Sequence, residues 1–309
     1  MPPLKCRRSG ATKNSLFFLI FLLIATPSHA PVQTQPLRDA LGYGFSPEPP
    51  AERIISLAPN LTEILFSIGL GDKIVGVTRF CNYPPEAKEI DKVGGIIDPD
   101  LEKIASLKPD LILAFRGTPL PVLARIRSMG WRLFVLNEGE TIEELFPLIR
   151  IVGQVTSREK QAEELSLSLE RRYEAVVKKL SFVASRPRVL LLLSGPGYWT
   201  SGGRGFLNDL LKKAGGTPVT AASRERWVLL NPEEVLGLAP EAIVILASSA
   251  EAFDKVKVSL LKKASLKAVP ALAQKRFFAL DENSSSRFGP RLIQALEELA
   301  RWLHPRAFQ

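Results

Sequence analysis

The sequence DLEKIASLKPDLILA, from Asp100 to Ala114, decides the fold because it returns 131 positions later as NPEEVLGLAPEAIVI, from Asn231 to Ile245. Each copy opens with a helix-capping residue, continues with apolar residues at helical spacing, and meets a proline before a buried-looking apolar run. A second echo, between residues 62–69 and 208–215, occurs in the same order. One helix-turn-strand unit is therefore built twice, which predicts two lobes with a cleft between them.

Apolar runs alternate with helical segments around both copies, and this alternation is typical of a mostly parallel sheet covered on both faces. Between the copies, a helical pattern starts at Thr141, is interrupted at 153–156 and resumes at 157–180 without glycine or proline. At about 1.5 Å per residue, the second part predicts a stiff linking helix about 35 Å long. We therefore expect an α/β protein whose two mostly parallel lobes are joined by a single long helix, with boundaries as follows: N-terminal lobe 52–156, linking helix 157–184, C-terminal lobe 185–309.

The first thirty residues have the zones of a secretory signal peptide. Four cations precede an apolar run at 16–25, and small residues follow it. The run is about half the length that a membrane-spanning helix needs. We therefore expect a signal peptide at 1–30, a flexible Pro- and Gln-rich leader at 31–51, and a soluble periplasmic protein. An uncleaved N-terminal segment that anchors the protein to the inner membrane is the alternative.

Composition excludes several function classes. Removal of residues 1–30 lowers the formal charge from +9 to +5, and the remaining cations are scattered among acids, so no nucleic-acid partner is expected. Only Cys81 and His304 then remain of their types, which argues against a disulfide, a histidine base or a multi-histidine zinc site. The glycine-rich stretch 195–205 lacks the residues of a phosphate loop and is interpreted as a turn that displays Tyr198 and Trp199.

Aromatic and polar residues gather where the predicted strands end, which is where parallel α/β sheets bind ligands. They are Arg79, Phe80, Asn82, Tyr83, Phe115, Arg116, Tyr198, Trp199, Trp227 and Arg287. Flat aromatic faces suit a large, flat or apolar ligand, and the arginines and amides would orient its polar edge. Acids such as Glu63 and Glu233 lie at predicted helix starts, where acids are favoured anyway, and we expect no catalytic and no metal-binding residue.

Six stretches together resemble the periplasmic cobalamin-binding proteins, within the larger group that captures ferric siderophores, haem and corrinoids for ABC importers. They are SLAPNLTEILFSIG, VGVTRFCNYPPEA, KPDLILAFRG, GYWTSGGRGFLNDLL, NPEEVLGLAPEAIVI and RFGPR, and the likeness as a whole runs from about residue 53 to 302. The resemblance implies the fold of class III periplasmic binding proteins, with two α/β lobes on one long helix that resists hinge motion.

The resemblance also implies roles for individual residues. Phe80, Phe115, Trp199 and Trp227 would line the ligand cleft with Arg116, Arg287 would face the polar periphery of the ligand, and Asn60 would make a further contact. Glu233 matches the acid with which the second lobe docks on the permease subunits. Three positions depart from the family pattern, because Pro121 replaces the first-lobe docking acid, Leu136 a cleft aromatic and Asn283 an acidic partner of Arg287.

These observations predict an exported, monomeric solute-binding protein that captures a corrinoid such as cobalamin and delivers it to an ABC importer. It would use no catalytic cofactor and perform no covalent chemistry. A receptor for a ferric siderophore or for haem is the nearest alternative, with Tyr83 or Tyr198 as the axial ligand in the haem case. A two-domain α/β enzyme using the same cleft and an anchored sensor are alternatives from other classes.

Overall fold

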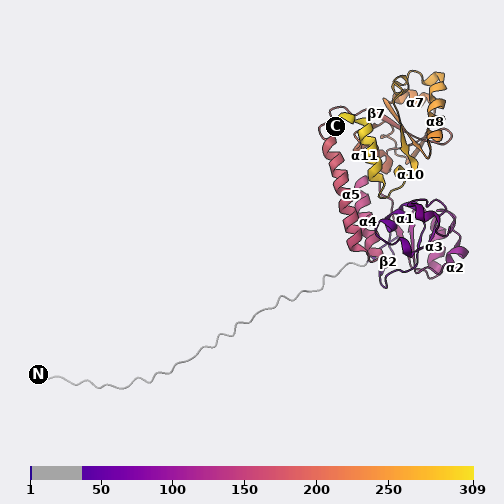
Figure 1. Cartoon of the computed structure of the whole chain (residues 1–309), viewed down its shortest axis with the longest axis vertical. Coiled ribbons are helices and arrows are strands. Elements are labelled where there is room, and N and C mark those ends of the chain that lie inside the picture. The colour runs from indigo at the N-terminus through magenta and orange to yellow at the C-terminus, as the bar shows by residue number, and fades with distance from the viewer. Residues whose placement is uncertain (2–36) are drawn as a thin grey trace. The chain divides into compact units, whose positions relative to one another are not determined.

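The computed structural model describes Met1 and residues 37–309, so the predicted signal peptide and the start of the leader lie outside the described residues. Residues 37–309 form one compact unit with two lobes (Figure 1). No helix in this part of the chain has the length and apolar composition to cross a membrane.

The N-terminal lobe is built on a four-stranded parallel sheet in the order β4, β3, β5, β6. The strands are β3 (Ile54–Ser56), β4 (Ile74–Val77), β5 (Leu111–Phe115) and β6 (Leu133–Leu136). Alternate side chains enter two different cores, so both faces of the sheet are covered, as in other parallel sheets. The covering helices are α1 (Pro59–Ser67) on one face and α2 (Leu101–Ser106) and α3 (Leu120–Ser128) on the other.

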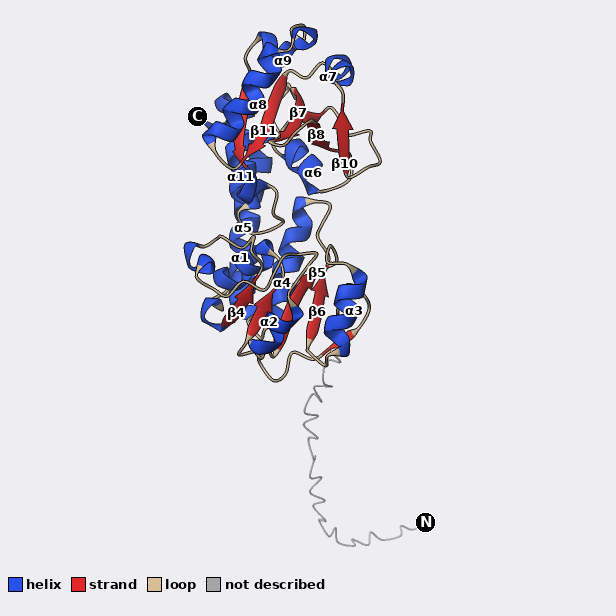
Figure 2. Cartoon of the chain, turned by 90° about the vertical axis from the view of Figure 1, so that its right-hand side faces the viewer, coloured by secondary structure: helices blue, strands red, loops and turns tan. Residues whose placement is uncertain are grey.

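The C-terminal lobe repeats this design with a parallel sheet in the order β12, β11, β7, β9, of which Figure 2 labels β7 and β11. Its strands are β7 (Arg188–Leu193), β9 (Thr217–Pro218), β11 (Ala242–Ala247) and β12 (Phe277–Asp281). The helices α6 (Phe206–Lys213) and α11 (Leu292–Leu303) cover one face, and α7 (Pro232–Leu238), α8 (Ala250–Lys262) and α9 (Pro270–Ala273) cover the other. A short helix α10 (Glu282–Ser285) follows β12.

The predicted repeat is present in both lobes. Asp100 caps α2 by accepting a hydrogen bond from the Lys103 backbone N–H at 2.9 Å, and Asn231 caps α7 in the same way with a capping box. Each helix then ends in a non-glycine residue with positive φ directly before the proline, Lys108 at 47° and Ala239 at 43°. The two copies therefore share the strained turn as well as the helix and the strand.

The helices α4 (Leu145–Val155) and α5 (Glu159–Leu180) link the lobes. The predicted interruption falls between them, where Thr156 Oγ1 donates to the Val152 carbonyl and Ser157 has a φ of 55°. The N-terminal half of α5 packs on α4, because Gly153 lets Ala162 approach closely, and its C-terminal half packs on α11. With 22 residues, α5 is about 33 Å long, enough to reach from one lobe to the other.

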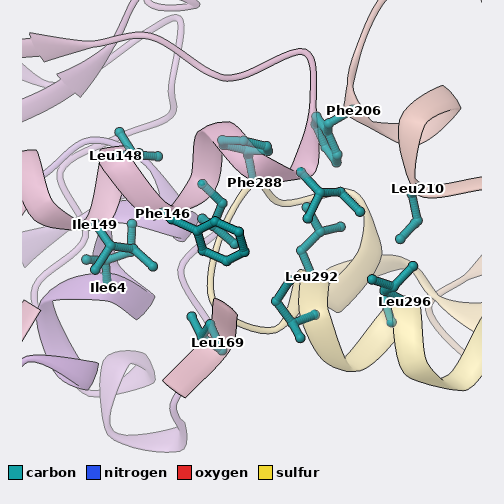
Figure 3. Close-up of a cluster of buried hydrophobic side chains, with 14 of the residues drawn as sticks. Ile64, Phe146, Leu148, Ile149, Leu169, Phe206, Leu210, Phe288, Leu292 and Leu296 are labelled. Carbon is teal, nitrogen blue, oxygen red and sulfur yellow. The ribbon is translucent and has the colours of Figure 1, made fainter. Parts of the chain in front are cut away.

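One hydrophobic core runs through both lobes around these helices. Figure 3 shows Ile64 and Phe146 from the N-terminal half, Leu169 of α5, and Phe206 and Leu292 from the C-terminal half within one cluster. Bending the lobes apart would expose part of this core to water, which costs free energy in proportion to the apolar area uncovered. The fold therefore resists hinge opening.

Two segments differ from the prediction. The leader was expected to be flexible to residue 51, but β1 (Leu37–Arg38) and β2 (Gly44–Phe45) form a hairpin on the N-terminal lobe, with the Asp39 carboxylate buried against Arg127 at 2.7 Å. The stretch interpreted as a turn displaying Tyr198 and Trp199 contains the strand β8 (Tyr198–Ser201), which pairs antiparallel with β10 (Trp227–Leu230). The turn before β8 is therefore limited to residues 194–197, between β7 and β8.

Candidate ligand-binding site

A cavity of about 640 Å³ lies between the lobes. Most of its lining follows strands β3 to β6 of the N-terminal lobe, and the rest comes from the C-terminal lobe, before β10 and after α10. The lining residues are Ala58, Pro59, Asn60, Phe80, Ile96, Phe115, Arg116, Gly117, Asn137, Glu138, Arg226, Ser286, Arg287 and Phe288. The cavity therefore occupies the position at which parallel α/β sheets bind ligands.

Five of the seven residues predicted to bind ligand line this cavity: Asn60, Phe80, Phe115, Arg116 and Arg287. The apolar part of the wall consists mainly of Phe80, which is half exposed at 48%, together with Ile96, Phe115 and Phe288. The Arg79 guanidinium lies 5.3 Å from the centroid of the Phe80 ring, and it also pairs with Asp98 at 2.6 Å. Arg79, which Asp98 fixes, thus helps to hold the exposed Phe80 ring in place.

The two predicted tryptophans lie outside the cavity, on the ribbon formed by β8 and β10. Trp199 stands opposite Leu229, and Trp227 stands opposite Ser201, so all four side chains share one face of the ribbon. Trp199 and Trp227 are 40% and 42% exposed, whereas Thr200 and Leu230 on the other face are buried. Trp227 directly follows Arg226, which lines the cavity, so the strand β10 begins next to the cavity wall.

Arg287 lines the cavity, but its guanidinium is engaged with protein groups. It donates to Asn82 Oδ1 at 2.8 Å, to the Phe80 carbonyl at 3.1 Å and to Asn283 Oδ1 at 2.6 Å. It also pairs at 3.3 Å with Glu63, a carboxylate in α1 that is only 2% exposed. Asn283 therefore serves as an acceptor where the family pattern has an acid, while the charged partner of Arg287 comes from the other lobe.

Glu63 is shared with a second arginine. Arg291 donates to both of its carboxylate oxygens, at 2.9 and 2.6 Å. Burial disfavours the charged form of Arg291, but the hydrogen bonds and the attraction to Glu63 outweigh burial and raise the guanidinium pKa above its ordinary value. Together with Asn60, which donates to the Phe288 carbonyl at 3.1 Å, this network ties the lobes together next to the cavity.

A second polar cluster joins the lobes through α5. Glu143 accepts hydrogen bonds from Lys213 of α6 and from the Tyr173 hydroxyl of α5. Burial favours the neutral form of Glu143, but these hydrogen bonds outweigh it and lower the pKa of its carboxyl below the ordinary value of 4.5. Burial and the hydrogen bond to Glu143 raise the pKa of Tyr173 to about 12.

Sequence reasoning missed nine of the fourteen described residues that line the cavity, among them Asn137, Glu138 and Arg226. Asn137 and Glu138 directly follow β6. The rule that ligands bind where parallel strands end (the strand-end rule), which found Phe80 and Phe115, therefore also applies to them. Arg226 Nη2 donates to Glu138 Oε2 across the cavity. By contrast, Arg116 is exposed, and its guanidinium forms no hydrogen bond or ion pair with another of residues 37–309. Arg116 is thus the cation of the wall that is free for a ligand.

The remaining predicted positions lie away from the cavity. Glu233 is exposed in the first turn of α7, and Pro121 is exposed in the first turn of α3. Tyr83 lies beneath Arg291 at 4.0 Å, and Tyr198 lies beneath Lys263 at 5.4 Å. Among residues 37–309, those that line the cavity include no histidine, tyrosine, cysteine or methionine. In the part of the chain that the structure describes, no three His, Cys, Asp or Glu residues are placed to hold a metal ion.

Two parallel α/β lobes on one long helix, with a cavity between them, define a class III periplasmic binding protein. The chain belongs to the periplasmic binding protein family, whose sequence profile matches residues 54–284. It is therefore a solute-binding protein of the kind that serves ABC importers.

Three similar proteins show the range of the family. The chain is 30% identical to the uncharacterised ABC transporter substrate-binding lipoprotein YvrC of Bacillus subtilis, over 84% of this chain and 82% of that protein. The periplasmic haem-binding protein RhuT of Roseiflexus sp. RS-1 shares 30% identity, covering 83% of this chain and 99% of that chain with a TM-score of 0.75. The vitamin B12-binding protein BtuF of Vibrio cholerae shares 27% identity, covering 84% and 99% with a TM-score of 0.73.

Proposed function

We propose that the protein captures a corrinoid, cobalamin or a close relative, in the interlobe cavity and delivers it to an ABC importer. The observation that carries this proposal is the charge balance of the wall. Of its three arginines, Arg226 pairs with Glu138 and Arg287 pairs with Glu63, so Arg116 alone remains free. A cobalamin carries neutral amides around a flat ring and a single phosphodiester, which one free guanidinium and the amides of Asn60 and Asn137 suit.

The same wall argues against the nearest alternatives. Haem iron in proteins is held by His, Cys, Met or Tyr, and the lining supplies none of them, whereas a cobalamin brings its own axial ligands. Ferric siderophores of high negative charge favour several free cations. Haem nevertheless stays the second candidate, because the similar structure from Roseiflexus sp. RS-1 is a haem-binding protein.

The ribbon extends the proposed site. A corrinoid with its nucleotide loop is larger than a cavity of about 640 Å³, so part of it would lie on the adjoining face that Trp199 and Trp227 share. Each tryptophan still has a large apolar surface to bury. We therefore retain both tryptophans as ligand contacts beside Asn60, Phe80 and Phe115.

Transport would follow from docking on the permease. The exposed acid Glu233 in the first turn of α7 is the proposed contact. A charge at the edge of an interface guides the approach of the partner and fixes its orientation. We propose that the protein acts as a monomer in the periplasm after export. Retention of the N-terminal segment as an anchor is the alternative, and the mass of the protein found in the periplasmic and in the membrane fraction distinguishes the two.

One titration tests the proposed function. The purified protein is titrated with cyanocobalamin, haemin and a ferric siderophore while binding heat and tryptophan fluorescence are followed. We expect saturable one-to-one binding of cyanocobalamin with quenching of fluorescence. Binding of haemin or the siderophore without any binding of cyanocobalamin would refute the corrinoid proposal, and turnover of any of the three would favour an enzyme.

A further inference from the structure

Glu138 and Arg226 stand on opposite lobes and form an ion pair across the cavity. Glu138 follows β6 in the N-terminal lobe, and Arg226 precedes β10 in the C-terminal lobe. Arg226 Nη2 donates to Glu138 Oε2, and both side chains line the cavity. The side chains are 48% exposed for Arg226 and 30% exposed for Glu138, so the pair would stand at the surface that meets a ligand.

The backbone next to each partner is held in place by neighbouring residues. The Arg226 carbonyl accepts a hydrogen bond from the Gly202 N–H at 2.9 Å, which fixes the backbone where the ribbon begins. The loop that carries Glu138 runs directly against Phe288 of the other lobe, because Gly139 has no side chain to keep the ring away. The pair is therefore preorganised, unlike an ion pair between two long side chains on an open surface.

We propose that Glu138 determines specificity by neutralising Arg226, so that the cavity prefers a ligand with neutral amide side chains over one with several carboxylates. The proposal rests on the function proposed above. Arginine binds carboxylates strongly through its planar, forked guanidinium, and a free Arg226 beside the free Arg116 would give the wall two such groups. Glu138 engages one of them and brings the net charge of the pair to zero, so the attraction of the wall for carboxylates falls.

The proposal is tested with two ligands of nearly the same shape, cyanocobalamin and its tricarboxylic acid, in which three neutral side-chain amides are hydrolysed to carboxylates. Dissociation constants are measured by calorimetry for the wild type and for Glu138→Gln at low salt, because screening weakens such interactions. We expect Glu138→Gln to shift the affinity ratio about tenfold toward the tricarboxylic acid. The ratio isolates charge, since any general damage to the site affects both ligands.

Two further variants serve as controls. Glu140→Gln removes one negative charge two residues away, from an exposed side chain outside the cavity lining, and should leave the ratio within about twofold of the wild type. Adding Arg226→Gln to Glu138→Gln removes the freed cation and should restore the wild-type ratio. An unchanged ratio in Glu138→Gln, or an equal shift in Glu140→Gln, would overturn the role of Glu138.

Failure of the proposed function gives a different result. If the wild type binds haemin and no corrinoid, the corrinoid proposal is lost, and the pair is judged with haemin against its dimethyl ester, which lacks the two carboxylates. A tenfold shift toward haemin in Glu138→Gln would then support the role of Glu138 in selecting against carboxylates, and an equal ratio in both proteins would refute it.

Discussion

Replacing Glu63 tests whether the buried network at the cavity joins the lobes. Glu63→Gln keeps the size of the side chain but removes the charge that Arg287 and Arg291 share. The carboxylate is 2% exposed and the arginine side chains are 13% and 17% exposed, so solvent cannot replace the lost partner. Removal of one partner from a buried pair costs about 3–5 kcal/mol, and the retained amide oxygen places this variant near 3 kcal/mol.

The measurement is thermal unfolding of the ligand-free protein, followed by circular dichroism. For a chain of this size, a loss of about 3 kcal/mol lowers Tm by about 6 °C. Glu52→Gln is the matched control, because Glu52 also pairs with a cation, Lys73, but its side chain is 65% exposed. An exposed pair contributes about 0–1 kcal/mol, so the control should shift Tm by at most about 2 °C. If Glu63→Gln and Glu52→Gln shift Tm equally, the network does not hold the lobes together.

Three further results are expected. Truncation of Trp199 or Trp227 to alanine should weaken cyanocobalamin binding by about 1–3 kcal/mol in calorimetry. The control Phe182→Ala, at an aromatic that is 87% exposed, should leave the affinity unchanged. Equal affinities in all three variants would remove the ribbon from the site. Glu233→Ala should leave ligand affinity unchanged but reduce uptake in cells, and normal uptake would exclude it from docking. Because the pKa of Glu143 is lowered in the folded protein, its contribution to stability is present above pH 4.5 and is lost as pH falls. The difference in free energy of unfolding between the wild type and Glu143→Gln, measured by urea titration, should therefore shrink below pH 4.5. A difference that stays constant with pH would contradict this.

The repeated unit could be predicted from sequence because its signals are local. Helix caps at Asp100 and Asn231 and the prolines that follow act within a few residues. The positive φ that Lys108 and Ala239 share in the structure was not predicted. The class of fold follows from such units, since strands that alternate with helices can hardly form anything other than parallel sheets. The fold class was therefore predicted correctly.

The ribbon and the ion pairs depend on contacts between distant residues, and for these the sequence has no local signal. Strand β8 pairs with β10 across an intervening helix and strand, and no spacing rule specifies that register. The partner of Arg287 was sought near Asn283, whereas the structure supplies Glu63 from the other lobe, 224 residues away. Asn137 and Glu138 are a different case, because the strand-end rule applied to β6 would have found them.

The bonds between the lobes bear on how binding occurs. The shared core, the Glu63 network and the Glu143 cluster all cross from one lobe to the other, so a large opening would break them together. A receptor of this kind does not spend binding free energy on domain closure, and its affinity depends on the complementarity of a preformed wall. The proposed selectivity would then come from side chains of this wall such as Glu138 and Arg116. A change at these positions should consequently alter which ligand binds without altering the fold.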